Sequence, residues 1–369
     1  MRDRQISDFI RSYRNSPIYY SLLWNEYKKS KGLSDTNKIS VPRRANPNKK
    51  LKIVVVLRNN ESNVFKPLTG SYMLEIAKCL EEFNSSYEVR IFHCTDYIND
   101  WKIELKEFLV SNEIDVLIIN PESDPDLSGN WTWDNFYLSL ANLWNGFSIM
   151  ILYDSVYVTH IHRVNHLLHL GISGVVIPID RDIKKFIKFR RKAYGPYPLP
   201  FSFKSVEKIQ SLIEHQRESK KIEFTFFGTL YPHREKQLQK LINRGLPISI
   251  ASLSNLNYQP TYEEFFIKLI NSKFTINLSR PSRPRSPKHH KLRVIEALLA
   301  DVFVLSDYYK LDKKILDVHQ QILPLNLNLK SLKLKENKLN KLHIEDKLRI
   351  SQMMIIKIDD LISKAFSRK

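Results

Sequence analysis

The chain is 369 residues long and contains 43% hydrophobic and 26% charged side chains, a composition that excludes wholesale disorder and fibrous repeats. This length exceeds one ordinary hydrophobic core, so we expect two domains. The 58 Lys and Arg residues against 39 Asp and Glu residues give a formal net charge of +19, which favours anionic partners: nucleotide diphosphates, nucleic acids or an anionic membrane face.

The first 50 residues are predicted to form a helix and a basic linker. Apolar side chains recur at three- and four-residue spacings over residues 1 to about 30, which predicts a helix. Residues 34–50 are basic, contain proline and show no periodicity, as a linker or surface strap would. No apolar run suits a signal peptide, and the densest, 147–153, is far shorter than the ~20 residues that span a bilayer. We expect a cytoplasmic protein, with any membrane contact peripheral at the inner face.

From Leu51 onward, apolar runs alternate with amphipathic segments, which is typical of a parallel α/β sheet. Five strands are predicted, at 51–57, 88–93, 115–120, 147–154 and 174–178. Helices are predicted between them, at 71–82, 102–111, 133–144 and 159–170. Cys79 and Cys94 lie in apolar runs of this series, so neither a disulfide framework nor a cysteine metal site is expected.

Pro196, Pro198 and Pro200 follow a basic run and break regular structure, which indicates a crossover into a second domain. Its strands are predicted at 222–227, 247–251, 274–278 and 302–306. Its helices are predicted at 233–244, 262–271 and 289–300. The predicted fold class is therefore α/β, with two Rossmann-like doubly wound domains that face a cleft.

The last part of the chain differs in composition. Residues 323–342 are rich in Leu, Lys and Asn, and 344–367 is predicted to be an amphipathic helix that packs on the body, although its basic face suits lipid equally well. The predicted organisation is a helix and linker at 1–50, an N-terminal domain at 51–195, a C-terminal domain at 196–325, and a low-complexity segment with the last helix at 326–369.

Glycine is scarce, and this scarcity narrows the nucleotide-binding motifs that are available. The chain has 9 glycines and no Gly-x-Gly, so a dinucleotide fingerprint and a Walker-type phosphate loop are both excluded. Gly228 directly follows a predicted strand and precedes a helix that carries Arg234, at the carboxyl end where such sheets bind ligands. The alternative is an ordinary strand-to-helix turn.

A basic segment after the strand at 274–278 is the strongest candidate site. Its cations are Arg280, Arg283, Arg285, Lys288 and Lys291. The segment leads into a helix with Arg293 and Glu296 near its start, where free N–H groups and cations would suit a diphosphate. Glu296 could accept hydrogen bonds from a ribose diol. Alternatively, Arg293 and Glu296 form a plain surface ion pair.

Three runs in this region resemble the C-terminal domain of the spore-maturation and spore-coat glycosyltransferases. They are FTFFGTLYPHREKQLQKLINRGLPISI, YEEFFIKLINSKFTINLSR and KLRVIEALLADVFVLSD, in that order within 222–307. This family has the two-domain GT-B architecture, so the resemblance implies that a nucleotide-sugar donor binds the C-terminal domain. A glycan, lipid-linked molecule or protein would then be the acceptor.

The resemblance also implies roles for individual residues. A strand followed by Gly and a later Arg lines the donor pocket in this family, which corresponds to Gly228 and Arg234. The start of the following helix binds diphosphate and ribose, which corresponds to Lys288, Arg293 and Glu296. Many retaining GT-B enzymes carry a second glutamate eight positions earlier, where this chain has Lys288. The stereochemistry of transfer therefore stays open, as does the role of the additional arginines at 280–285.

The N-terminal domain is expected to supply the acceptor site and the catalytic base. Asp154 ends a predicted strand and could deprotonate an acceptor hydroxyl; a turn or capping role is the alternative. His160 is a second candidate base. No metal site and no cofactor is expected, because the histidines at 160–169 have no acidic or cysteine partner on their helix face. The function predicted is a metal-independent glycosyltransferase; a basic nucleic-acid-binding protein or an inactive glycan-binding relative are the alternatives.

Overall fold

The protein is seen here in a computed structural model. It describes residues 49–59, 71–95, 101–120, 140, 143–152, 174–178, 193–216, 222–228, 230–251, 262–279, 292–308, 310, 321–327, 330–332 and 342–367. The predicted helices at 1–30, 133–144 and 159–170 lie wholly or mostly outside these residues. No helix in the described ranges is long and apolar enough to cross a membrane.

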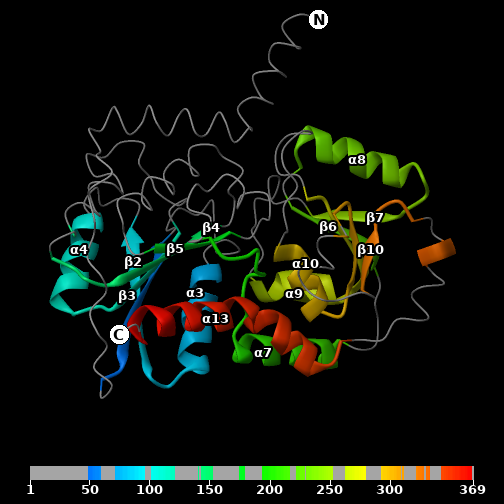
Figure 1. Ribbon diagram of the computed structural model, residues 1–369. Coiled ribbons are helices and arrows are strands. Elements are labelled where there is room, and N and C mark those ends of the chain that lie inside the picture. Colours follow the sequence, from blue (N-terminus) through cyan, green and yellow to red (C-terminus); the bar gives the residue numbers. More distant parts are fainter. Residues whose placement is uncertain are drawn as a thin grey trace, which may run out of the picture. The chain divides into compact units, whose positions relative to one another are not determined.

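Five parallel strands form the first sheet, in the order β2-β1-β3-β4-β5. Strands β2, β3, β4 and β5 are labelled in Figure 1. They are β1 (Leu51–Asn59), β2 (Tyr87–Thr95), β3 (Val116–Ile119), β4 (Phe147–Leu152) and β5 (Gly174–Pro178). All described side chains of β3 and β4 are buried, as expected for strands covered on both faces. The helices α3 (Ser71–Phe83) and α4 (Trp101–Ser111) follow β1 and β2.

Five further parallel strands form the second sheet, in the order β10-β9-β8-β6-β7. They are β6 (Ile222–Phe227), β7 (Ile248–Ala251), β8 (Ser272–Asn277), β9 (Phe303–Ser306) and β10 (Ile322–Pro324). The chain runs from β6 to β7 on one side and then crosses to β8 on the other. The strand order therefore reverses between β6 and β8, the point at which open α/β sheets bind ligands.

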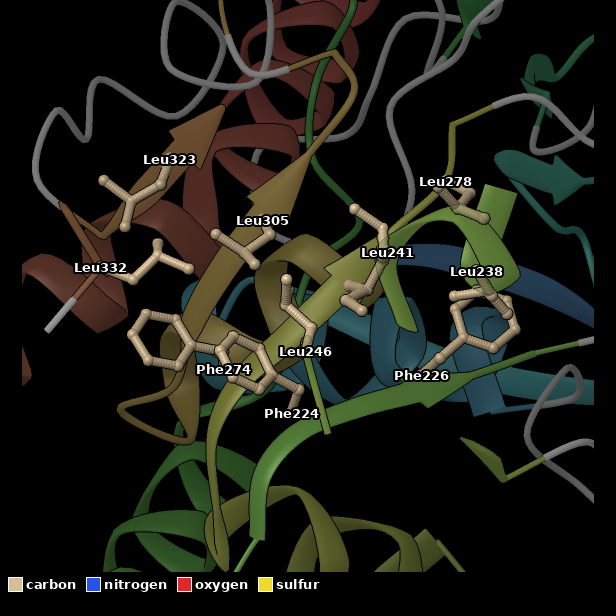
Figure 2. Close-up of a cluster of buried hydrophobic side chains, with 11 residues drawn as sticks. Phe224, Phe226, Leu238, Leu241, Leu246, Phe274, Leu278, Leu305, Leu323 and Leu332 are labelled. Carbon is tan, nitrogen blue, oxygen red and sulfur yellow. The ribbon is translucent and has the colours of Figure 1, made fainter. Parts of the chain in front are cut away.

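The second sheet is covered by helices on both faces. Helix α8 (Pro232–Ile242) packs Leu238 and Leu241 on a core cluster with Phe224, Phe226, Phe274 and Leu278 of the strands and their ends (Figure 2). Helices α9 (Tyr262–Ile270) and α10 (Leu292–Leu299) contact β8, and α10 also contacts β9. Since side chains alternate along a strand, Thr225 and Phe227 belong to the face opposite α8.

The two sheets confirm the predicted α/β class with two doubly wound, Rossmann-like domains. The described residues group into two compact units, one with β1–β5 and the other with β6–β10 and most of α3. The predicted C-terminal helix is also confirmed: α13 (Ile344–Ser367) buries Ile350, Met354, Ile358 and Ile362. Its residues up to Ile356 group with the second unit and those from Lys357 with the first.

Two elements were not predicted from the sequence. Helix α7 (Phe203–His215) buries only Val206, Ile209 and Ile213, a narrow apolar stripe within an otherwise polar segment. Strand β10 is three residues long and lies at the start of the Leu-, Lys- and Asn-rich region that we expected to be low in complexity. Its parallel pairing with β9, rather than any local pattern, gives it a defined structure.

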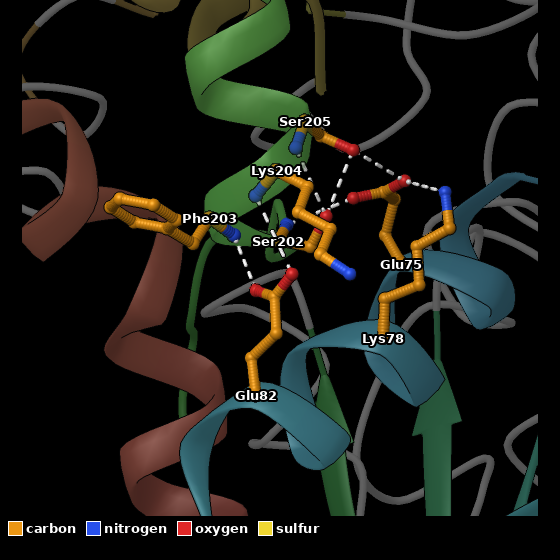
Figure 3. Close-up of polar contacts among 7 residues, drawn as sticks. All are labelled: Glu75, Lys78, Glu82, Ser202, Phe203, Lys204 and Ser205. Atoms are coloured by element: carbon orange, nitrogen blue, oxygen red, sulfur yellow. Dashed lines mark hydrogen bonds and ion pairs between the residues drawn. The ribbon is translucent and has the colours of Figure 1, made fainter.

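Carboxylates of α3 accept hydrogen bonds at the start of α7 (Figure 3). Glu75 accepts from the Ser202 backbone N–H at 2.8 Å and from the Ser205 hydroxyl at 2.9 Å. Glu82 accepts from the backbone N–H of Phe203 at 2.6 Å. These carboxylates satisfy N–H groups that an α-helix leaves unpaired, and they complement the positive end of its dipole. Helix α7 in turn contacts α9 and α10, so this network supports the helices beside the candidate site.

Both cysteines of the chain are among the described residues, are buried and form no disulfide, as predicted. Burial raises the pKa of the Cys79 thiol, and the negative charges of Glu75 and Glu82 raise it further. The thiol form is therefore favoured over the reactive thiolate.

Candidate functional site

The carboxyl end of β6 brings Gly228 and Arg234 together. Gly228 has φ +146°, a conformation that side chains rarely adopt. A Cβ atom at this position would lie 3.8 Å from Nη1 of Arg234 and 3.6 Å from the Phe226 ring. The backbone therefore passes close to the guanidinium, and a glycine here is required by its conformation.

Arg234 is held in the first turn of α8. Its side chain is largely buried, with 8% of the residue exposed, and Cζ lies 5.3 Å from the centroid of the Tyr231 ring. Pro232 stands in the first turn of α8, where its missing N–H leaves no intrahelical bond unmade. A nearly buried guanidinium at this end of the sheet supplies fixed positive charge beside the turn at Gly228.

Arg293 and Glu296 occupy the first turns of α10. Nε of Arg293 lies 3.5 Å from Oε2 of Glu296, and the Arg293 side chain is 24% exposed whereas that of Glu296 is 3% exposed. The ion pair that the spacing predicted does form, but its carboxylate is buried, so the alternative of a plain surface pair is wrong for Glu296. A carboxylate in this environment is held by specific partners rather than by water.

Two aromatic rings also contact the Arg293 guanidinium. Cζ of Arg293 lies 5.0 Å from the Phe265 ring centroid and 5.8 Å from that of Phe227, and the two rings contact each other edge to face at 5.0 Å. Phe227 immediately precedes Gly228 in β6, and Phe265 comes from α9. These contacts orient a planar cation, partly shielded from water, beside the carboxyl end of β6.

The ends of β8 and β9 complete the same edge of the sheet. The Asn277 side chain donates to the Ser306 hydroxyl at 3.1 Å, and the Ser279 backbone N–H donates to Oδ1 of Asp307 at 2.9 Å. These bonds connect the two strand ends just before residue 280, where the basic segment begins. Ser279, Phe265 and Tyr231 were not among the residues that the sequence singled out.

The structure thus places four predicted donor-site residues in one region. Gly228 directly follows β6, Arg234 lies in the first turn of α8, and α10 carries Arg293 and Glu296; all belong to the second unit. The strand order reverses next to β6, which is where sheets of this topology bind nucleotides. The arrangement offers fixed cations, a close-approach glycine and one buried carboxylate.

Seven other predicted residues lie outside the described part of the chain and stay predictions. They are the basic residues Arg280, Arg283, Arg285, Lys288 and Lys291 and the candidate bases Asp154 and His160. The chain order nevertheless fixes where the basic segment starts and ends: it runs from the residue after Ser279 to the residue before α10. Within the described ranges, no group of three His, Cys, Asp or Glu side chains could hold a metal ion.

Two doubly wound, Rossmann-like parallel sheets in one chain are the architecture of the GT-B class of fold. No protein-family model matches the chain, and neither does any curated protein. Solved structures do. An alpha-glucosyltransferase in complex with UDP-glucose and DNA containing an abasic site is 13% identical, with a TM-score of 0.51, over 85% of this chain and 100% of that one.

Two further solved structures show a weaker likeness. A glycosyltransferase involved in avilamycin A biosynthesis is 10% identical, with a TM-score of 0.48, over 86% of this chain and 98% of that one. The UDP-GlcNAc 2-epimerase of Methanocaldococcus jannaschii, in complex with UDP-GlcNAc and UDP, is 13% identical, with a TM-score of 0.40, over 83% of this chain and 99% of that one. At these identities the likeness is one of fold. Only the alpha-glucosyltransferase, of the three, is similar enough in structure to support the GT-B fold.

Proposed function

We propose that this protein is a glycosyltransferase that moves a sugar from a nucleotide-diphosphate donor to a hydroxyl acceptor without a metal ion. The observation that carries the proposal is the grouping of Gly228, Arg234, Arg293 and Glu296 around the carboxyl end of β6. The fold shared with the alpha-glucosyltransferase structure, which contains UDP-glucose, supports it. So does the resemblance of residues 222–307 to the spore-coat glycosyltransferases.

Each residue has a role that its chemistry suits. Arg293 binds the diphosphate through its outer N–H groups, since its Nε already faces Glu296. The buried Glu296 carboxylate accepts hydrogen bonds from the ribose hydroxyls. Gly228 lets the donor approach the backbone of β6, and Arg234 adds positive charge behind that turn.

The reaction transfers the anomeric carbon from the diphosphate oxygen to the acceptor oxygen. Negative charge builds up on the leaving diphosphate, and the cations of the basic segment 280–291 together with Arg293 offset it. Asp154 or His160 accepts the proton of the acceptor hydroxyl. A glycan, a lipid-linked molecule or a protein is the acceptor in this proposal.

If arginines and lysines replace a divalent ion in this way, removing metals should leave the reaction intact. We expect turnover of the preferred UDP- or GDP-sugar to change by less than about twofold when a chelator is added, because fixed cations stabilise the leaving group. Release of UDP or GDP, measured with and without chelator on the same preparation, checks this. A loss of more than about tenfold, restored by Mg²⁺ or Mn²⁺, would show that a metal supplies the charge instead.

The formal charge of +19 favours one second candidate, a nucleic-acid-binding protein whose basic segment grips phosphates. Affinity for DNA or RNA that falls steeply with salt, together with no affinity for UDP- or GDP-sugars, would favour this candidate. Binding of a sugar nucleotide that Arg293→Ala clearly weakens would favour the transferase.

A further inference from the structure

Ser279 is a buried residue at the switch point of the second sheet. It follows β8 by two residues, is 0% exposed, and its backbone is fixed by the bond from its N–H to Asp307. Leu278, immediately before it, belongs to the core cluster on the α8 face. Leu278 shares this cluster with Phe274 and Ile276 of β8, so the alternation of the strand continues past its end. The Ser279 side chain therefore belongs to the opposite face, which α9 and α10 cover.

The polar side chains on this face lie in a row that runs toward the carboxyl edge of the sheet and ends at Ser279. The other members of the row have hydrogen-bond partners. Thr225 Oγ1 donates to the Phe274 carbonyl at 3.3 Å, Thr275 Oγ1 donates to the Thr225 carbonyl at 3.4 Å, and Asn277 donates to Ser306. The Ser279 hydroxyl, the outermost of the row, is buried and has no partner among the described residues.

A buried hydroxyl without a partner destabilises a protein, and such groups concentrate where a ligand or catalytic step uses them. The position of Ser279 in the second sheet is a second reason to expect a ligand beside it. Ser279 lies two residues past the end of β8, the strand next to β6, at the point where the strand order reverses, and residue 280 begins the basic segment.

We infer that the Ser279 hydroxyl is a donor-binding group that donates a hydrogen bond to a phosphate oxygen of the nucleoside diphosphate. The inference rests on the proposed function and extends it to a residue outside the basic segment and α10. Phosphate oxygens are strong acceptors, and a hydroxyl held by a fixed backbone needs little reorganisation to meet them. The same burial that disfavours the hydroxyl in the empty protein strengthens its bond to the ligand.

Two opposite effects of one substitution test the inference. In Ser279→Ala, which removes one oxygen atom, we expect binding of UDP or GDP to weaken about fivefold to tenfold. The melting temperature of the ligand-free variant should equal or exceed that of the wild type, because the alanine has no unmet hydrogen bond. Calorimetric titration and thermal unfolding of the full chain measure the two quantities.

Ser272→Ala is the matched control, because Ser272 is also 0% exposed and starts the same strand. Its hydroxyl donates to the Lys268 carbonyl at 2.9 Å, so its loss should lower the melting temperature and leave nucleotide affinity unchanged. Unchanged affinity in Ser279→Ala, beside a wild type that binds, would overturn the inference alone; water or the basic segment would then satisfy the hydroxyl. A wild-type chain that binds neither UDP nor GDP would overturn the proposed function as well.

Discussion

Replacing Arg293 by alanine is expected to weaken binding of UDP or GDP about 30-fold, equivalent to about 2 kcal/mol. The side chain is positioned by Glu296 on one edge and by the Phe227 and Phe265 rings on its face, and 24% of it remains exposed for a ligand. Charge-assisted hydrogen bonds to phosphate are among the stronger ones in proteins, and their loss appears directly in affinity. Isothermal titration calorimetry of variant and wild type measures it.

Arg349→Ala provides the matched control for Arg293→Ala. Arg349 also pairs with an acidic residue three positions away, Asp346 at 3.6 Å, but on the exposed surface of α13. We expect its replacement to leave nucleotide affinity unchanged. Arg293→Lys should fall between the wild type and the alanine variant, because lysine keeps the charge and loses the planar fork of donors. Affinities that are equal in Arg293→Ala and the wild type would contradict the role of Arg293.

Glu296 calls for a milder substitution than alanine. Because it is almost fully buried, alanine would leave a cavity and change stability together with binding. Glu296→Gln keeps the volume and removes the charge that pairs with Arg293. This variant separates the roles of the two residues. If Glu296→Gln lowers the affinity for uridine or guanosine as well as for UDP or GDP, Glu296 itself binds the ribose.

Replacing Lys347 by methionine is expected to lower the free energy of unfolding by about 3–5 kcal/mol. Nζ of Lys347 lies 2.9 Å from Oδ1 of Asp301, and both side chains are nearly inaccessible to solvent. The same ammonium donates to the Gln210 side chain of α7 at 3.1 Å. Methionine would leave the Asp301 carboxylate buried without its cation. Urea unfolding of the variant and the wild type measures the loss.

The double variant Lys347→Met, Asp301→Asn distinguishes a charge effect from a packing effect. Asp301 has φ +55°, a conformation that asparagine tolerates well, so the second substitution removes the charge without straining the backbone. We expect it to recover most of the lost stability. If the double variant is as unstable as Lys347→Met, the ion pair does not account for the effect of Lys347.

Except for β10, the strands of both sheets could be predicted from the sequence, because each is a short apolar run between polar segments. β5 and β6 begin and end where the sequence predicted. Elements that depend on tertiary contacts were harder to predict. Helix α7 has three buried apolar residues, and its start is stabilised by carboxylates of α3, which lie more than a hundred positions earlier in the sequence. The residues in and around α7 show no pattern that indicates these distant carboxylates.

The candidate site shows the same division. Gly228, Arg234, Arg293 and Glu296 could be predicted because glycine, arginine and glutamate at strand and helix ends suggest ligand chemistry whatever surrounds them. Phe265 and Ser279 could not, because their importance comes from packing: a ring from α9 beneath Arg293, and a hydroxyl that burial leaves without a partner among the described residues. One signal was available for Ser279, which is the serine that separates a buried strand from a run of arginines.

Hydrogen–deuterium exchange with and without a nucleoside diphosphate locates the ligand most directly. The account predicts that UDP or GDP, whichever raises the melting temperature, slows exchange in peptides that cover the turn at Gly228, the residues after β8 up to Ser279 and the first turn of α10. Slowed exchange confined to other parts of the chain, with these three segments unchanged while the nucleotide is bound, would contradict a donor site at the switch point of the second sheet.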